Sequence, residues 1–327
     1  MRHQIFYEIL TAIECPHRFL FLDKFIEPLT NSVEFKHSNI YLFAKVKKLR
    51  FDIKSTQLIN KRTLETTIIV GENQKIHVVE NLYNLVPILS VTYPTFEEFN
   101  DLFSDEDDFW SCEIDWSEST NDKIHFIHRT QKGDVFDSWI CPEYFNPTKN
   151  FELNPDYNNR PEVVYVGQSF RILDRITSHK TLHKAISELK DDEELKIYFL
   201  TFRYGYGGNT NYVKMYGKVF NTWLSEYGKT EEFKSKIDLV ERFLIHFLQP
   251  KYNTQHIKTN IENDRLVKEI CINNDIDSVT IDIGVKGKDF EFWSEKQKIK
   301  TDLCTFNFLE LGKGYQDELI TTEIDSE

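Results

Sequence analysis

Two titratable side chains fall on the apolar side of a predicted helix that runs from Phe170 to about Leu189. The apolar residues of this run share one arc: Ile172, Ile176, Leu182, Ile186 and Leu189. With about 3.6 residues per turn, Arg175 and His179 fall inside the same arc. A guanidinium cannot lose its proton to escape burial, so Arg175 must meet an anion. That anion is either a carboxylate of this protein, in a structural ion pair, or the phosphate of a ligand.

A second histidine follows His179 one helical turn later, at His183. Two histidines at this spacing would suit a metal site on a helix. However, the helix has no Glu in the position that zinc peptidases use, and no third ligand is in view. A hydrogen-bonded helical histidine is therefore the simpler interpretation.

A carboxylate lies at the edge of the apolar side of another predicted helix, Ile237 to Leu248. The apolar residues of that helix are Val240, Phe243, Leu244, Phe247 and Leu248. Glu241 sits between them and a polar stripe that contains Asp238 and Arg242. A half-shielded carboxylate is a good ligand for a hard divalent cation, although it is also a common structural feature.

The order and spacing of these residues resemble the signature of one nuclease family. Tyr165-Val166-Gly167 is followed by Arg175 eight residues after the glycine, and by His179 twelve residues after it. Glu241 is followed twelve residues later by Asn253, in a Pro-x-Tyr-Asn sequence. The first motif resembles the second half of the GIY-YIG nuclease signature, and the second resembles the downstream element of that family. The resemblance covers about 120 of the 327 residues.

The resemblance implies an α+β fold with a small three-stranded antiparallel sheet flanked by helices, and one bound Mg²⁺ or Mn²⁺. By position, Tyr165 would orient or deprotonate the attacking water, and Arg175 would neutralise charge on the scissile phosphate. Glu241 would hold the metal ion, His179 would be an accessory group near the water, and Asn253 would brace the site. A cation, a carboxylate and a preorganised positive group are what phosphodiester hydrolysis requires.

The first half of the signature is missing from its usual place, because no Gly-Ile-Tyr stands ten or so residues ahead of Tyr165. Its strand must therefore lie elsewhere. The candidates are Trp139-Ile140-Cys141, joined through a longer proline-rich connection, and Asn150-Phe151-Glu152. Neither places a tyrosine in the expected register, so the identity of the general base stays open.

The formal net charge of −13 argues, by itself, against a nucleic-acid ligand, because phosphate contacts need Lys and Arg. Between Pro161 and Asn260, however, 15 Lys plus Arg and 12 Asp plus Glu give +3, which leaves −16 on the other 227 residues. The basic section thus coincides with the motifs. The residues that we expect to contact nucleic acid are Gln168, Ser169, Arg171, Lys180, Tyr206, Lys214 and Lys218.

The last three of these residues belong to an insertion from Tyr204 to Lys236 that is rich in glycine, tyrosine and lysine. Such a loop could grip nucleic acid through phosphate contacts and base stacking. The alternative is a surface excursion without a binding role. An acidic stretch from Phe96 to Asp122, centred on Asp105, is predicted to be a solvated loop, and could cover the basic section until substrate displaces it.

Three sections are predicted. Residues 1–132 form a mixed α/β region with a helical start through Ile13, residues 133–260 the nuclease domain, and residues 261–327 a short β-rich extension with an acidic tail. The predicted strands are Ser38 to Phe43, Thr66 to Val70 and Lys75 to Val79 (the last two a hairpin), Val163 to Gly167, Leu195 to Phe202, Val279 to Ile283, Phe290 to Trp293, and Cys304 to Phe308.

The five cysteines are scattered and form no Cys-x-x-Cys pair, so neither a disulfide framework nor a structural zinc site is indicated. No apolar run approaches membrane-spanning length. We therefore expect a reduced, cytoplasmic protein without membrane contact. The N-terminal section would select the target or bind a partner, which includes a second copy of the chain.

These observations predict an endonuclease that hydrolyses DNA with a divalent metal ion. Restriction or host defence is the favoured setting, because a solitary nuclease domain with large unfamiliar flanks suits it better than housekeeping repair. Two alternatives stay open: a nucleic-acid-binding module that keeps the fold but has lost catalysis, and a member that cleaves RNA. The target sequence is not legible, because readout depends on groove contacts.

Overall fold

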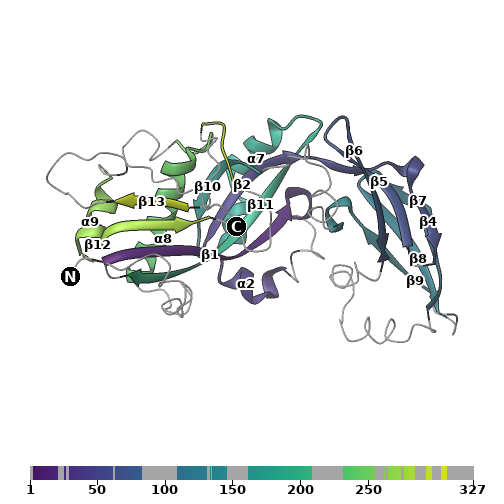
Figure 1. Cartoon of the computed structure of the whole chain (residues 1–327), viewed down its shortest axis with the longest axis horizontal. Helices are drawn as coiled ribbons and strands as arrows, with labels where there is room; N and C mark the ends of the chain where they lie inside the picture. The colour runs from purple at the N-terminus through teal and green to yellow at the C-terminus, as the bar shows by residue number, and fades with distance from the viewer. Residues whose placement is uncertain are drawn as a thin grey trace, which may run out of the picture.

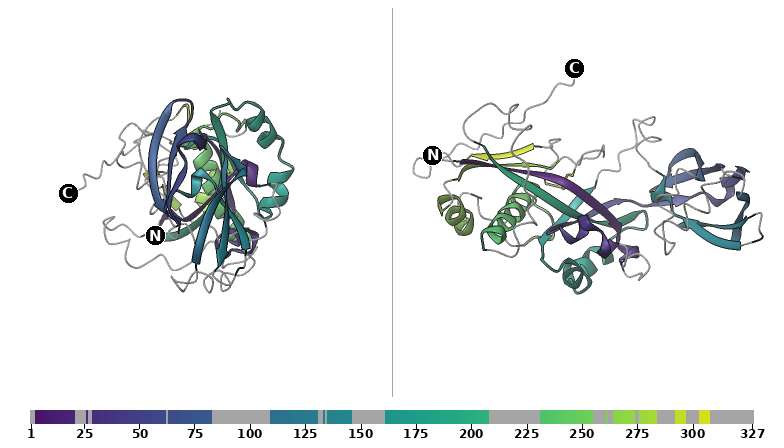
Figure 2. Two further views of the ribbon diagram at one scale, coloured as in Figure 1. Left: turned by 90° about the vertical axis from the view of Figure 1, so that its right-hand side faces the viewer. Right: turned by 90° about the horizontal axis from the view of Figure 1, so that it is seen from below.

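Two regions of β-sheet dominate this α+β chain (Figure 1). The computed structural model describes residues 3–20, 26, 29–61, 63–82, 109–130, 133, 135–145, 161–207, 231–254, 261, 264–273, 276–283, 292–296 and 303–307. One region is a body built on a six-stranded sheet. The other is a smaller unit of short antiparallel strands at one end of the long axis of the molecule (Figures 1 and 2).

The body sheet has the strand order β10-β2-β11-β1-β12-β13. Its strands are β1 (His3–Pro16), β2 (Ile40–Lys47), β10 (Glu162–Gln168), β11 (Glu193–Gly207), β12 (Ile276–Asp282) and β13 (Leu303–Asn307). Neighbouring strands are antiparallel except for the parallel pair β1 and β12. The sheet is therefore larger than the predicted three-stranded one, and it draws strands from both ends of the chain.

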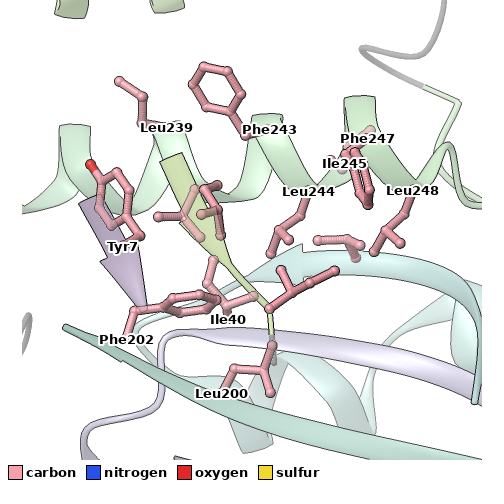
Figure 3. Packing of buried hydrophobic residues seen from close by; sticks show 14 of the residues in the cluster. Tyr7, Ile40, Leu200, Phe202, Leu239, Phe243, Leu244, Ile245, Phe247 and Leu248 are labelled. Atoms are coloured by element: carbon pink, nitrogen blue, oxygen red, sulfur yellow. The ribbon is translucent and has the colours of Figure 1, made fainter. Parts of the chain in front are cut away.

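Helices cover both faces of the body sheet, because alternate residues of β2 belong to different core clusters. Ile40 and Leu42 pack with α8 (Glu231–Leu248), as Figure 3 shows for Ile40 and the apolar side of the helix. Tyr41 and Phe43 belong to the cluster that contains α6 (Ile172–Thr177) and α7 (Lys180–Ser187). Successive side chains of a strand point to opposite faces, so β2 is buried on both. The other helices of the body are η1 (His17–Phe19), α2 (Val33–Lys36) and α9 (Arg265–Asn273).

The smaller unit, which we call the β lobe, lies between β2 and β10 in the sequence. It consists of β3 (Leu49–Phe51), η2 (Ile53–Ser55), β4 (Gln57–Asn60), β5 (Thr63–Val70), β6 (Gln74–Asn81), β7 (Phe109–Thr120), β8 (Lys123–Thr130), β9 (Val135–Ile140) and η5 (Pro142–Tyr144). β3 to β6 form one sheet and β7 to β9 another. Side chains of both sheets, Phe51 and Phe126 among them, form a hydrophobic cluster of their own.

Several predicted elements agree with the structure and several do not. The hairpin of β5 and β6 is confirmed, with Gly71 at φ 61 in its turn. The predicted N-terminal helix is wrong, because that segment is β1, which pairs with β11 on one side and β12 on the other. The acidic stretch is a strand from Phe109 onward, while Asp105 lies outside the described residues. The predicted strand Leu195 to Phe202 is longer at both ends.

The predicted boundary after residue 132 does not separate two units. It falls between β8 and β9, which are paired with each other. β1 and β2 from the first predicted section lie in the same sheet as β10 and β11 from the second. The third section also joins that sheet through β12 and β13, and it contains α9, which was not predicted. Trp293 bridges to Glu162 at the start of β10.

Among the described residues, no helix combines the length and the apolar character that a membrane crossing needs.

Candidate functional site

Two tyrosines from neighbouring strands stand at the centre of the site. Tyr41 on β2 pairs with Gly167 on β10, and Tyr165 pairs with Phe43. The ring centroids of Tyr41 and Tyr165 are 6.0 Å apart. A Cβ atom at Gly167 would lie 2.7 Å from atoms of both tyrosine rings. The glycine is therefore required by the close approach of the two phenols to the strand backbone.

Tyr41 was not predicted as a site residue, and both sequence candidates for the missing first strand fail to supply it. Trp139 and Ile140 lie in β9, which pairs with β8 in the β lobe. Asn150 lies outside the described residues. The strand that pairs with β10 is β2, which begins with Ile40-Tyr41, 124 residues ahead of Tyr165. The signal was Asn39-Ile40-Tyr41, which differs from Gly-Ile-Tyr in one residue.

His179 does not lie inside one long helix, as predicted, but in a break between α6 and α7. The hydroxyls of Thr177 and Ser178 donate back to the carbonyl oxygens of Leu173 and Asp174, and α6 ends there. His179 then has extended backbone, with φ −82 and ψ 110, and caps α7. The imidazole therefore faces the tyrosines instead of a helix groove.

The hydrogen bonds of His179 fix its tautomer. Its Nδ1 accepts the backbone N–H of Thr181 at 3.2 Å, so the ring proton of a neutral imidazole is on Nε2. Nε2 lies 3.1 Å from the Tyr165 hydroxyl and donates to it. Burial, followed by the charge of Arg175, lowers the pKa of His179 to about 4. The histidine is thus a neutral donor to Tyr165 near pH 7.

Arg175 is exposed, whereas the helix pattern predicted it to be buried. The reason is the early end of α6, which takes Arg175 out of the apolar arc that a continuous helix would have. No ion pair involves Arg175 among the described residues, and its neighbour is Tyr41. Burial raises the pKa of Tyr41, as does the adjacent Tyr165, while hydrogen bonding and charge from Arg175 act in the opposite direction. A structural Arg–carboxylate pair at this position is therefore not supported.

The two tyrosine hydroxyls are coupled to each other and to Glu241. Burial is the main cause that raises the pKa of Tyr165, and the negative charge of Glu241 raises it further. Hydrogen bonding from Tyr41 and the charge of Arg175 lower it. The Tyr165 hydroxyl oxygen thus accepts from both Tyr41 and His179, which are two donors that would stabilise a phenolate.

Glu241 lies in α8, and its charge is one of those that raise the pKa of Tyr165 after burial. Burial and then the charge of Asp238 raise the pKa of Glu241 to about 7. Arg242 and hydrogen bonding from the backbone and side chain of Gln168 act against this rise. The Gln168 side chain also donates through Nε2 to Asp238. The side chain of Gln168 is therefore bonded inside the protein, whereas it was predicted to contact nucleic acid.

Asn253 braces the backbone of β10. Its side-chain Oδ1 accepts the Val166 N–H at 2.9 Å, and its Nδ2 donates to the Val166 carbonyl at 2.8 Å. The backbone N–H of Tyr252 donates to the Val164 carbonyl at 2.9 Å, and the Tyr252 hydroxyl donates to Glu188 at 2.7 Å. These contacts cover the outer edge of the strand that carries Tyr165.

The other residues that were predicted to contact nucleic acid differ in where they lie: some are exposed, and some lie outside the described residues. Arg171 and Lys180 are exposed beside α6 and α7. The hydroxyl of Ser169 accepts the N–H of Arg171 at 3.0 Å. Tyr206 is in β11 opposite Ile5, which shows that the predicted insertion begins later than Tyr204. Its side chain, and both Lys214 and Lys218, lie outside the described residues.

A two-histidine metal site is not supported. Both ring nitrogens of His179 are engaged by Thr181 and Tyr165, and His183 is exposed. In the described ranges, no three His, Cys, Asp or Glu side chains are grouped to hold a metal ion. A carboxylate such as Glu241, supplemented by water and substrate oxygens, is how Mg²⁺ is commonly bound.

Segments that are far apart in the sequence thus bring two phenols, an imidazole, a guanidinium and a carboxylate together. These groups can position a water molecule, accept its proton and offset negative charge. Comparisons with family models, with curated proteins and with solved structures found no match to this chain.

Proposed function

We propose that this chain is a divalent-metal-dependent nuclease with a GIY-YIG-like centre, in which β2 supplies the first tyrosine. The observation that carries the proposal is the cluster of Tyr41, Tyr165 and His179, together with the charge of Glu241 that acts on Tyr165. The sequence motif lacks a tyrosine for the first half of the signature, and we assign Tyr41 to that position because β2 pairs with the strand of Tyr165. This assignment favours a catalytic site over the non-catalytic module.

The residues of the site have distinct parts in the proposed reaction. Tyr165 is the proposed base in its phenolate form, which the hydrogen bonds from Tyr41 and His179 would stabilise once the phenol has released its proton to solvent. The phenolate then takes a proton from the attacking water and returns to the phenol. Arg175 is exposed and carries a permanent charge, so it is suited to a substrate phosphate. Asn253 holds the β10 backbone in place.

Glu241 is suited to a hard cation, because its carboxylate is half-buried and lies near a second carboxylate. Burial and the neighbouring charge both disfavour the ionised form of Glu241, which a bound cation would stabilise. A divalent cation held there would supply Lewis-acid stabilisation of the charge on the phosphate. Mg²⁺ and Mn²⁺ both prefer such oxygen ligands.

DNA is the proposed substrate, and restriction or host defence is the proposed setting. RNA is the second candidate substrate class. The test is incubation of the purified chain with plasmid, single-stranded DNA and RNA, each with Mg²⁺, Mn²⁺ or EDTA. Metal-dependent cleavage of one of them supports a nuclease, while binding without cleavage supports the non-catalytic module.

The decisive variant is Glu241→Gln, which keeps the size of the side chain and removes its charge. We expect normal folding, retained nucleic-acid binding, and cleavage that is slower by about a hundredfold or more. Glu269→Gln is the matched control, because Glu269 is exposed and its one ion pair among the described residues is with Arg265 four residues away, a pair that contributes little to stability. Cleavage by Glu241→Gln at the wild-type rate in Mg²⁺ would exclude the proposed role.

A further inference from the structure

One glutamine connects the strand of the site to two carboxylates of α8. Gln168 is the last residue of β10, and its Nε2 donates to Oδ1 of Asp238. Gln168 also neighbours Glu241, because its backbone and its side chain are among the groups that lower the pKa of that carboxyl against the larger effect of burial. Asp238 and Glu241 are three residues apart and therefore lie on the same side of the helix. The end of the strand and the helix thus meet at the Gln168 carboxamide, which lies between the carboxylates of Asp238 and Glu241.

The chemistry of the carboxamide explains why a glutamine is present. Two carboxylates at this spacing repel each other, and an NH₂ group has two hydrogens that can serve one carboxylate each. The other end of the amide, Oε1 of Gln168, is buried and has no hydrogen-bond partner among the described residues. An unsatisfied buried acceptor is unfavourable by about 1–3 kcal/mol. The orientation of the amide is therefore set by the carboxylates, in spite of this cost.

We infer that Gln168 and Asp238 are positioning residues for Glu241. Gln168 fixes the Glu241 carboxylate beside Tyr165, and Asp238 holds the Gln168 amide in the orientation that does so. The inference rests on the proposed function of Glu241 as the ligand of a divalent cation. Partners that orient a metal ligand commonly change metal affinity by about 10- to 100-fold when they are removed.

The test uses the full-length chain and Mn²⁺ as the probe, in the absence of nucleic acid. Mn²⁺ affinity is measured by calorimetric titration for the wild type, Gln168→Leu, Asp238→Ala and Asp238→Asn. We expect Gln168→Leu and Asp238→Ala to bind Mn²⁺ about tenfold or more weakly. Asp238→Asn should recover part of the loss, because its amide oxygen still accepts from Gln168. Asp191→Asn, an exposed site in the turn before β11, controls for the loss of one negative charge.

Cleavage as a function of Mg²⁺ concentration provides the second measurement. For Gln168→Leu we expect the Mg²⁺ dependence to move to higher concentration, with the rate recovering toward the wild-type value at saturation. Thermal unfolding followed by circular dichroism shows whether each variant is folded. If Gln168→Leu does not fold, the comparison of Asp238→Ala with Asp238→Asn tests the positioning role without it.

The outcomes separate the inference from the proposed function. If the wild type neither binds Mn²⁺ nor cuts, the function of Glu241 is wrong. If the wild type binds and cuts, while folded Gln168→Leu and Asp238→Ala match it in Mn²⁺ affinity and Mg²⁺ dependence, the positioning role is wrong. Equal loss in Asp238→Ala and Asp238→Asn would also overturn it, since charge alone would then explain the effect.

Discussion

The hydroxyl of Tyr41 is a group in the proposed site whose loss should reduce activity strongly without disturbing the fold. Tyr41 is only 1% exposed, and its ring stays in place in Tyr41→Phe. The substitution removes the donor to Tyr165 and the partner of Arg175. We expect cleavage to slow by about a hundredfold or more, the range of acid–base contributions, with a stability loss of about 1 kcal/mol.

Tyr252→Phe is the matched control for that variant. Its hydroxyl also donates one hydrogen bond, to Glu188, but the bond lies at the surface beside α7. Single-turnover cleavage and denaturant unfolding of both variants make the comparison. If Tyr41→Phe cut as fast as Tyr252→Phe, β2 would have no part in the chemistry.

Most of the individual site residues were identified from the sequence, because motif spacing within one segment survives folding. Arg175 and His179 were named from their spacing after Gly167, and His179 lies at Tyr165, although the predicted helix is broken between α6 and α7. Tyr41 was missed, because the expected spacing of about ten residues between the two tyrosine strands is replaced by 124 residues. A linear pattern cannot show which distant strand will pair with β10.

Among the secondary-structure elements, α8 was predicted from the helical recurrence of its apolar residues, and β10 from a short apolar run that ends at a glycine. β1 was mistaken for a helix because Ile5, Ile9 and Ile13 recur every four residues. In β1, a bulge between Ile9 and Thr11 instead sends Ile9 and Ile13 to different core clusters. Every fourth residue fits one face of a helix, and also one face of a strand without a bulge, so the spacing leaves both structures open. Pairing with β11 and β12 decided between them, and this pairing is not visible in the local sequence.

The start of β11 meets the β lobe through buried charges. Arg18 donates to Glu194 of β11 and to Glu143 of η5, both at 2.6 Å. Glu194 is 2% exposed, and burial followed by the charge of Glu143 raises its pKa to about 7, from 4.5. The protonated carboxyl therefore favours the folded state, so this contribution is present below pH 4.5 and is lost as the pH rises through 7.

Glu194→Gln tests this linkage, since the amide stays neutral at every pH. Between pH 4.5 and 7.5 the free energy of unfolding of the wild type should fall relative to that of the variant, by on the order of 2 kcal/mol. Urea unfolding at a series of pH values measures the difference. Parallel curves for the two proteins would show that Glu194 titrates normally in the folded chain.

For the molecule as a whole, the β lobe should be dispensable for chemistry. Its two sheets have their own hydrophobic cluster, which contains no residue of the proposed site, while Trp139 and Cys141 at the end of the lobe pack in the cluster of Tyr41. The strands on either side of it are paired, with Lys45 opposite Glu162. A short turn that replaces residues 48–160 would therefore close β2 and β10 into a hairpin.

We expect this shortened chain to fold cooperatively and to retain metal-dependent cleavage of nonspecific DNA within about tenfold of the full chain. Circular dichroism, thermal unfolding and a plasmid assay make the measurement. A folded but inactive product would mean that the lobe completes the site. A changed choice of target with intact chemistry would give the lobe a role in selection.

Because Lys45 and Glu162 are adjacent, the segment between them is also a suitable place to insert another domain by engineering. The chain leaves and re-enters the body across one antiparallel strand pair, so any domain whose ends lie about 5 Å apart can be spliced in without altering the register. The two tyrosines sit on the two strands that flank the graft. A ligand-responsive domain placed there would pass any change in the spacing of its ends to both strands, so the proposed cleavage should depend on its ligand.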